Sequence, residues 1–460
     1  MKILKYISIM AISVSVLLSN EMELEFEDEI LLSQQGSAHQ KFPEAVSTDD
    51  GTLHIVWVRE LGNNKNVMYC QSTDAGETFS ESVQINQNDN DIVAFIQSGP
   101  KIKVIGDELF IIYMDDRSGY TSIYMNRSAD NGFTWGDDML ISDQSYLKAY
   151  PDMEVGPDGT LNLIYYSYNQ NNSFNSVRYT STEPGSIEFS ASISVGLVDD
   201  YQEPCDCCQP DLEISRNGDI YLAYRNNIND IRDTYIAIKP NGSDSFNQLI
   251  RASFHNDYNN HCPSSGPSIA INDNYVALSY RVSDAANSYI NYSDISTLSF
   301  DNEVNINSSD ASPNFSNITL HNDFLHVGWI DYETGNPDVL YGVSQIGSSQ
   351  LVNVQRMNQN IEESYIMQKD PKVHWHNENL FYFWSDKRGT FYQLYYRKSI
   401  TNTFAGDING DGVLNIQDII LIVTMVLSGD YSTLADMNED GTVNILDVVL
   451  VAFIILNSEP

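Results

Sequence analysis

Two acidic segments near the C-terminus have the residue types and the spacing that bind calcium. Each places oxygen-bearing side chains at positions 1, 3, 5, 9 and 12 of a twelve-residue loop, and position 7 adds its backbone carbonyl. The first loop offers Asp407, Asn409, Asp411, Val413, Asn415 and Asp418. The second repeats the spacing with Asp436, Asn438, Asp440, Thr442, Asn444 and Asp447. Because Ca²⁺ takes six to eight hard oxygen ligands, the tandem loops predict two calcium sites.

Four cysteines form a second group with chemical potential. Cys205, Cys207 and Cys208 are close in sequence, and Cys262 follows His261. In an exported chain, a disulfide from this trio to Cys262 is one interpretation. The alternative is a soft-metal site for zinc or copper, built from the four thiols with His255 or His261 nearby. No spacing of His and Asp indicates a cysteine nucleophile, and Cys70 is expected to be the unpaired cysteine.

Arginine is scarce in this acidic chain, yet five arginines fall in equivalent loops of the repeat described below. They are Arg59, Arg117, Arg225, Arg281 and Arg388. A guanidinium group binds carboxylate or sulfate through two parallel hydrogen bonds, so these residues are candidate ligands of an anionic glycan. The alternative is that they form ion pairs with neighbouring Asp and Glu residues.

Composition and the N-terminus indicate where the protein works. The chain has 460 residues, with 24 Lys and Arg against 63 Asp and Glu and a net charge of −39. This excess of acid disfavours nucleic acids and anionic membranes as partners. Lys2 and Lys5 precede the apolar run from Ile7 to Leu18, which is shorter than the ~20 residues of a membrane span. We therefore expect a signal peptide and a secreted, periplasmic or cell-surface protein rather than a membrane anchor.

An internal repeat predicts the fold. Seven segments open with Pro and alternating apolar residues, beginning at Pro43, Pro100, Pro151, Pro210, Pro267, Pro313 and Pro371. Two or three further short strands follow each opener, and four strands per ~50 residues are typical of β-propeller blades. Proline suits the first position of a strand. We expect a mainly β, seven-bladed propeller, with six blades as the alternative. The seventh unit lacks a fourth strand, and Glu29–Ser33 is expected to supply it and close the ring.

Two turns of this repeat carry a family resemblance. Residues 72–79 and 128–135 share the pattern Ser-x-Asp-x-Gly-x-Thr-aromatic, in which Ser and Asp bond backbone donors and Gly takes a left-handed conformation. The pattern resembles the Asp-box of the sialidase and BNR-repeat propellers, over roughly residues 29 to 400. The Asp-box marks the fold and lies on the face opposite the family's active site.

The resemblance also implies where an active site would lie. Sialidases hold the sugar carboxylate with three arginines and use a Tyr nucleophile assisted by Glu, with an Asp acid. At the position of the first arginine this chain has Lys41, which cannot form the same two-bond clamp. The loop expected to carry the acid contains Arg59 and Glu60 but no Asp, and Tyr365 is only a conjectural nucleophile. The resemblance leaves open an exo-sialidase-type glycoside hydrolase, a noncatalytic glycan- or protein-binding propeller, and a metal-dependent enzyme.

The C-terminal loops carry a second resemblance. Each is followed by an apolar segment, Ile419–Leu427 and Val448–Leu456, and the pair resembles a type I dockerin domain. This implies docking onto a cohesin-like partner and a role in polysaccharide breakdown. The segments either pack on each other or face a partner, and Asp447 argues against a C-terminal membrane tail. Where cellulosomal members commonly have small hydroxyl pairs, this chain has Ile416-Gln417 and Ile445-Leu446. The predicted organisation is a signal peptide at 1–20, a propeller at 21–402 and a dockerin-like domain at 403–460.

Overall fold

The structure is a computed structural model, and it describes most of the chain. The described residues are 24–32, 37–89, 91–143, 145–171, 173–195, 203–306, 312–359, 367–376, 379–400, 405–408, 414–432, 434–438 and 440–457. The predicted signal peptide lies outside them. The chain divides into two compact units, which are described separately below.

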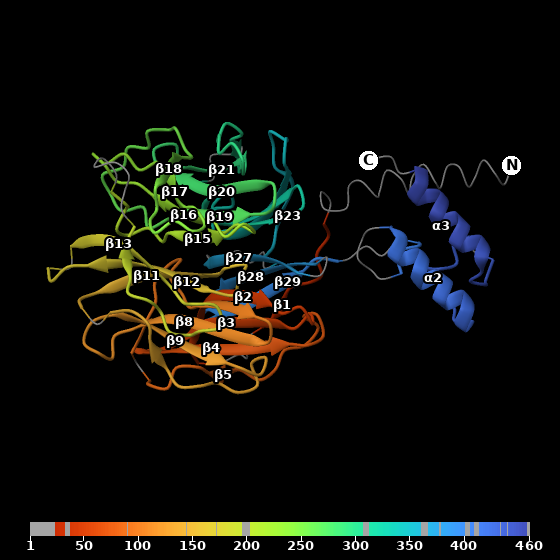
Figure 1. The fold of residues 1–460 in the computed structure, drawn as a ribbon, viewed down its shortest axis with the longest axis horizontal. Coiled ribbons are helices and arrows are strands. Elements are labelled where there is room, and N and C mark those ends of the chain that lie inside the picture. Colours follow the sequence, from red (N-terminus) through yellow and green to blue (C-terminus); the bar gives the residue numbers. More distant parts are fainter. Residues whose placement is uncertain are drawn as a thin grey trace. The chain divides into compact units, whose positions relative to one another are not determined.

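Seven antiparallel sheets form the blades of a propeller (Figure 1). The first sheet contains β2 (His39–Ser47), β3 (Leu53–Leu61), β4 (Asn64–Ser72) and β5 (Val83–Gln84). The second contains β6 (Ile92–Val93), β7 (Lys101–Ile105), β8 (Glu108–Asp115), β9 (Ser122–Ser128) and β10 (Met139–Leu140). The third contains β11 (Lys148–Val155), β12 (Leu161–Tyr168), β13 (Phe174–Ser181) and β14 (Ile193–Ser194). The fourth contains β15 (Asp211–Ile214), β16 (Ile220–Arg225), β17 (Thr234–Lys239) and β18 (Gln248–Arg251). The fifth contains β19 (Ser268–Ile271), β20 (Tyr275–Val282), β21 (Asn287–Asp294) and β22 (Val304–Asn305). The sixth contains β23 (Asn314–His321), β24 (Phe324–Asp331), β25 (Asp338–Gln345) and β26 (Val352–Arg356). The seventh contains β27 (Gln368–His376), β28 (Asn379–Asp386) and β29 (Gln393–Lys398), together with β1 (Ile30–Leu31). The prediction of seven blades is confirmed.

The N-terminal strand closes the ring, as predicted. β1 is the outermost strand of the seventh blade and pairs with β29, with Ile30 opposite Tyr396 and Leu31 opposite Tyr395. The pairing covers the backbone groups that would otherwise form an open sheet edge.

Buried second strands build the core between blades. Every residue of β12 and β28 is buried, as expected for strands covered on both faces by neighbouring sheets. Val56 and Val58 of β3 pack in one cluster with Ile111 and Tyr113 of β8, so adjacent blades share their apolar side chains.

Proline does not open every first strand, which corrects the prediction for three blades. Pro43, Pro151 and Pro371 lie inside β2, β11 and β27. The pairing registers of β2 and β11 shift at this point, between Lys41 and Glu44 and between Ala149 and Asp152. A β-bulge leaves a residue out of the ladder, so a proline is tolerated there without loss of a ladder hydrogen bond.

The C-terminal unit contains the two described helices, α2 (Ile416–Ser428) and α3 (Ile445–Asn457). Asn415 caps α2, and Asp418 completes a capping box with it. Ile422 of α2 packs with Val451 and Ile454 of α3, so one face of each apolar helix is buried in a mutual core. None of the described helices is long and apolar enough to cross a membrane.

Candidate functional site

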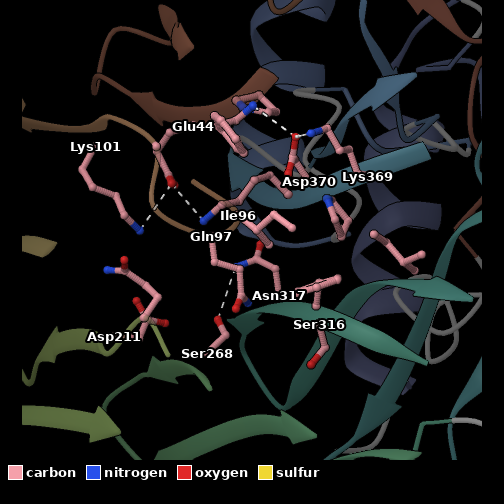
Figure 2. Close-up of a pocket in the computed structure, with 18 of the residues that line it drawn as sticks. Glu44, Ile96, Gln97, Lys101, Asp211, Ser268, Ser316, Asn317, Lys369 and Asp370 are labelled. Atoms are coloured by element: carbon pink, nitrogen blue, oxygen red, sulfur yellow. Dashed lines mark hydrogen bonds and ion pairs between the residues drawn. The ribbon is translucent and has the colours of Figure 1, made fainter. Parts of the chain in front are cut away.

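A pocket lies where the innermost strands of six blades begin (Figure 2). Its polar lining includes one residue from each of these strands: Glu44, Lys101, Asp211, Ser268, Asn317 and Lys372. Phe42, Ile96 and Phe315 add apolar surface at the rim. A concave site with aromatic walls and convergent polar groups is the usual form of a small-ligand site.

Polar side chains in this ring, together with Asp152 of β11, tie neighbouring blades to each other. Asp152 Oδ2 accepts a hydrogen bond from the backbone N–H of Leu212 at 2.9 Å. Asp211 Oδ2 accepts from Ile269 at 2.8 Å, and Asn317 Oδ1 accepts from Val373 at 3.0 Å. Each bond reaches the innermost strand of the next blade, so residues that line the pocket also fix its shape.

Glu44 is the ionised carboxylate of the pocket. Its Oε2 lies 2.9 Å from the Lys372 Nζ and 3.6 Å from the Lys101 Nζ, and Figure 2 shows it between two amino groups. Burial alone would raise the pKa of Glu44, but these lysines more than offset burial and lower the pKa to about 2.

Asp211 has the opposite electrostatic character. Burial, reinforced by the charge of Asp152, raises the pKa of Asp211 to about 7, against the opposing charges of Lys101 and Lys372. Asp211 is therefore protonated over part of the neutral range. A protonated carboxyl group and an ionised one in the same pocket are the pair that acid–base catalysis requires.

The rim of the pocket contains several residues in the left-handed backbone region. Phe42, Phe315 and Asp370 have φ values of 59°, 52° and 56°. Gln97 has a φ of 59°, and its Oε1 accepts from the backbone N–H of Gly266 at 2.8 Å, which joins loops that precede β7 and β19. Non-glycine residues in this region cost of order 1–3 kcal/mol each and gather at binding and catalytic sites.

The five arginines do not line the pocket, and four of them are engaged internally. Arg117 pairs with Asp115 and with Asp138, the latter at 2.9 Å, and Arg388 pairs with Glu29 and with Asp386, the latter at 2.7 Å. These are the internal ion pairs that the sequence allowed as the alternative.

The remaining arginines differ in exposure. Arg225 is 2% exposed and pairs with Asp257, while Arg281 donates to Ser312 Oγ at 2.9 Å. Arg59 is exposed and forms no ion pair within the described ranges. Binding of a ligand by the arginines stays a prediction.

The positions expected from the sialidase resemblance are only partly described. The Lys41 Nζ lies 3.0 Å from Glu60 Oε2. β3 and β4 pair as far as Leu61 and Asn64, so the loop expected to carry an acid is a tight hairpin turn through Gly62. Tyr365 lies outside the described residues.

Two of the four clustered cysteines form a disulfide, and the other two lie beside it. Cys207 and Cys262 are joined, and Cys70, Cys205 and Cys208 are free and buried. Cys205 Sγ lies 3.1 Å from Cys208 Sγ, and Arg232 Nη1 donates to it at 2.8 Å. The hydrogen bond from Cys208, followed by Arg232 and Arg225, lowers the pKa of Cys205 to about 7 against the effect of burial. The disulfide uses two thiols of the predicted zinc or copper site, and a metal there stays a prediction.

The second calcium loop is described at all six ligand positions. Asp436 and Asp447 are buried, and neither pairs with a lysine or arginine in the described part of the chain. Two buried carboxylates without a basic partner, grouped with the oxygens of Asn438, Asp440 and Asn444, are a donor set that fits Ca²⁺. In the first loop Asp407, Asn415 and Asp418 are described, whereas Asn409, Asp411 and Val413 lie outside the described residues.

The pocket residues escaped the sequence analysis although a signal for them was present. Each Pro opener alternates apolar and polar residues, and the polar ones include Lys101 and Lys103, Asp152 and Glu154, and Asp211 and Glu213. Because alternate residues of a strand face opposite sides, charged residues at every second position of an innermost strand predict a charged channel.

Comparisons with known proteins identify one part of the chain. Residues 405–456 match the family model of the dockerin type I domain. These residues are a type I dockerin. Domains of this class bind calcium and dock onto cohesins. A search of curated protein sequences finds no match to the chain.

Solved structures share the propeller fold at low identity. The polysaccharide lyase Uly1 gives a TM-score of 0.51 at 12% identity, covering 82% of this chain and 99% of that one. A GH93 α-L-arabinofuranosidase of Fusarium graminearum gives 0.46 at 12% identity, covering 70% and 98%. A sialidase of Trypanosoma rangeli gives 0.44 at 9% identity, covering 88% and 62%. At these identities the likeness concerns the fold alone.

Proposed function

We propose that this protein is an exported propeller that acts on or binds anionic glycans and that its dockerin attaches it to a cohesin-bearing assembly. One observation carries the proposal: a dockerin, which serves attachment to a partner, is joined to a propeller with a central pocket on which charged side chains converge. The predicted signal peptide at residues 1–20 supports export, and both dockerin loops are proposed to hold Ca²⁺.

If the propeller cleaves its ligand, Asp211 is the proposed proton donor. It lines the pocket and is protonated over part of the neutral range, whereas Glu44 beside Lys372 is ionised. Proton transfer to the leaving oxygen of a glycosidic bond requires such a group. Tyr365 remains the conjectural nucleophile of a sialidase-type reaction.

A noncatalytic binding propeller is the second candidate, and one observation favours it. Arg117, Arg225 and Arg388 are held in internal ion pairs, which favours a structural role for them over the three-arginine clamp of sialidases. A binding module needs only the pocket and its rim.

The dockerin helices offer the proposed surface for the cohesin. Beyond their shared core, both helices expose apolar side chains: Ile416, Ile420, Leu421 and Leu427 of α2, and Ile445, Leu446, Val449, Phe453 and Leu456 of α3. Ile416 and Ile445 occupy equivalent loop positions, as do Ile420 and Val449. Exposed apolar faces of this size mark protein interaction sites.

The test is a turnover screen with purified residues 21–460 in calcium. The substrates are a fluorogenic sialoside and a panel of polysaccharides, followed by reducing ends and by the ultraviolet absorbance of unsaturated products. We expect turnover that falls about 100-fold in Asp211→Asn, since general acid catalysis contributes ~10²–10⁴-fold.

Further variants separate the candidates. Loss of sialoside turnover in Lys41→Ala and Tyr365→Phe would support a sialidase with an altered clamp. Asp273→Asn is the control, because among the described residues that exposed carboxylate pairs with the exposed Arg216 alone. Glycan binding without turnover would favour the binding module, and neither binding nor turnover would contradict the proposal.

A further inference from the structure

Three lysines surround one tyrosine ring beside the pocket. The Nζ atoms of Lys369, Lys41 and Lys387 lie 4.4, 5.7 and 5.7 Å from the centre of the Tyr392 ring. Lys41 belongs to β2, Lys369 to β27, and Lys387 follows β28, so the lysine cluster bridges the first and seventh blades. Lys369 also lines the pocket.

The lysine cluster has more positive charge than its carboxylates neutralise. Glu60 pairs closely with Lys41, at 3.0 Å. Asp370 is 3.9 Å from Lys369, and it already accepts from the Phe42 N–H at 3.3 Å and from Ser385 Oγ at 3.0 Å. Lys387 forms no ion pair with any residue that the structure describes. In a chain of net charge −39, three amino groups with one close partner make a local surplus of cations.

The excess of positive charge affects the pKa values of Lys369 and of the neighbouring His39. Burial lowers the pKa of Lys369, and the charges of Lys41 and Lys387 lower it further, although Asp370 opposes them. Burial and the Lys41 charge also lower the pKa of His39, whose ring lies 5.5 Å from that of Tyr392. An anion placed among the lysines would relieve this repulsion.

Aromatic rings flank the lysine cluster. The Phe42 ring is 5.1 Å from the Lys369 Nζ, and the Phe391 ring is 5.2 Å from that of His39. Flat apolar rings next to amino groups match a sugar ring that carries an acidic substituent, because the ring faces pack on aromatic carbon while the substituent meets the cations.

We propose that the lysine cluster of Lys41, Lys369 and Lys387 is an anion subsite that binds the carboxylate or sulfate group of a glycan extending from the pocket. The inference rests on the proposed function and names its ligand class. Lysine binds such groups as a point charge, so the subsite accepts either anion, unlike an arginine clamp shaped for a carboxylate.

Binding of three polymers to the full chain in calcium tests the subsite. Polygalacturonate carries carboxylates, dextran sulfate carries sulfates, and dextran is neutral. We expect at least one acidic polymer to bind, and we expect the double variant Lys369→Met with Lys387→Met to weaken it about 100-fold, roughly tenfold per charged contact. The single variant Lys387→Met, at a partly exposed position, should weaken it about tenfold and tests the subsite if the double variant does not fold.

Lys239→Met is the matched control. Lys239 also lies over a tyrosine ring, 5.7 Å from that of Tyr179, but alone. Its removal takes away the same charge without touching the lysine cluster, so affinity should be unchanged. Lys387→Arg should retain most of the affinity because it keeps the charge.

The outcomes separate the two proposals. Preference for polygalacturonate or for dextran sulfate identifies the anion, and binding of both supports the shared chemistry. Equal affinity of the wild type and the double variant for an acidic polymer would overturn the subsite but leave glycan binding intact. Binding of dextran alone would do the same, and binding of none of the three would contradict the subsite and the proposed function together.

Discussion

Asp211 couples the chemistry of the pocket to the stability of the propeller. Its pKa rises from an ordinary value of 3.8 to about 7 on folding, so the folded protein holds a proton that the unfolded chain releases between those values. Stability from this group is present below about pH 4 and is lost as the pH rises towards 7. Asp211→Asn cannot ionise, and it should raise the unfolding temperature relative to wild type more at pH 8 than at pH 5.

Thermal unfolding at both pH values measures this difference. Asp211→Asn keeps an oxygen that can accept from Ile269, so the tie between blades survives and the comparison isolates the charge. An equal effect at the two pH values would show that the pKa of Asp211 is not raised as we describe.

Cys205 is a second residue whose ionisation depends on its neighbours, on Cys208 most and on Arg232 after it. Arg232 is 7% exposed, it pairs with no carboxylate among the residues described, and its Nη1 lies 2.8 Å from Cys205 Sγ. Arg232→Met should therefore raise the pKa of Cys205 from about 7 towards that of a buried thiol. Ultraviolet titration of thiolate absorbance measures this change, with Cys205→Ser as the reference.

Disulfide mapping and metal analysis belong with that titration. The structure predicts two peptides linked by the Cys207–Cys262 disulfide under non-reducing conditions, and free thiols at Cys205 and Cys208. One equivalent of zinc or copper in the purified protein, with Cys207 and Cys262 reduced, would instead support the soft-metal interpretation of the sequence.

At the scale of elements, the repeated Ser-x-Asp-x-Gly-x-Thr turns depend on their glycines. In the second turn Gly132 N donates to Ser128 Oγ at 2.9 Å, and Thr134 N donates to Asp130 Oδ1 at 2.8 Å. Gly132 has a φ of 84°, and a Cβ there would meet the Tyr69 hydroxyl at 1.9 Å. Gly132→Ala should lower the free energy of unfolding by about 2–4 kcal/mol, through backbone strain and overpacking together.

Gly119→Ala separates those two causes. Gly119 has a φ of 90° but nothing within 4 Å of an added Cβ, so only backbone strain applies and the loss should be about 1 kcal/mol. Chemical denaturation of both variants gives the difference. Equal losses of unfolding free energy in the two variants would mean that the Tyr69 side chain moves away from the added methyl group at no cost.

The sequence predicted most elements because strand signals are local. The second and third strands of each blade appeared as apolar runs, and all seven pairs are present, as with Leu53–Val58 inside β3. A fourth strand was expected in most blades, but its bounds were harder to predict, because a two-residue pairing such as β14 or β22 has no periodicity to detect.

The site was harder to predict than the fold. The calcium loops could be proposed from the sequence because all the expected ligands of a loop lie within twelve residues. The pocket could not be proposed in this way, because Glu44, Asp211 and Lys372 come from three different blades. Arg117 and Arg388 follow β8 and β28 as expected, whereas Arg59, Arg225 and Arg281 lie within β3, β16 and β20 and not in loops. The sequence also could not show that Arg117 turns back onto Asp138. Distances between blades are set by tertiary packing, which single-sequence periodicity does not encode.

For the whole molecule, closure of the ring by β1 predicts the effect of a truncation. A chain that begins at Ser33 lacks β1 and leaves β29 as an open edge, whereas one that begins at Leu24 keeps the strand. The shorter chain also loses Glu29, the partner of Arg388. We expect its propeller to unfold at a temperature lower by about 5 °C or more and to self-associate, since an open edge pairs with other chains. Calorimetry and light scattering of the two chains test this; identical behaviour would contradict the closure.

Calcium should act on the dockerin alone. Its removal leaves the buried Asp436 and Asp447 without a cation, so the helical module should lose its structure while the propeller transition stays in place. Titration calorimetry should give two Ca²⁺ per chain, and Asp447→Ala should reduce this to one. The control is Asp430→Ala, an exposed residue outside the loops.

We propose that the propeller holds an anionic glycan in the pocket at the start of its innermost strands. A glycan array with the full chain in calcium is the decisive measurement, when the wild type is compared with Gln97→Trp, which fills the pocket mouth, and with Lys239→Met. We expect the wild type and the control to bind acidic glycans, and we expect Gln97→Trp to lose this binding. Undiminished binding by Gln97→Trp would place the ligand elsewhere on the protein, and a wild type that binds no acidic glycan would show that the pocket does not hold one.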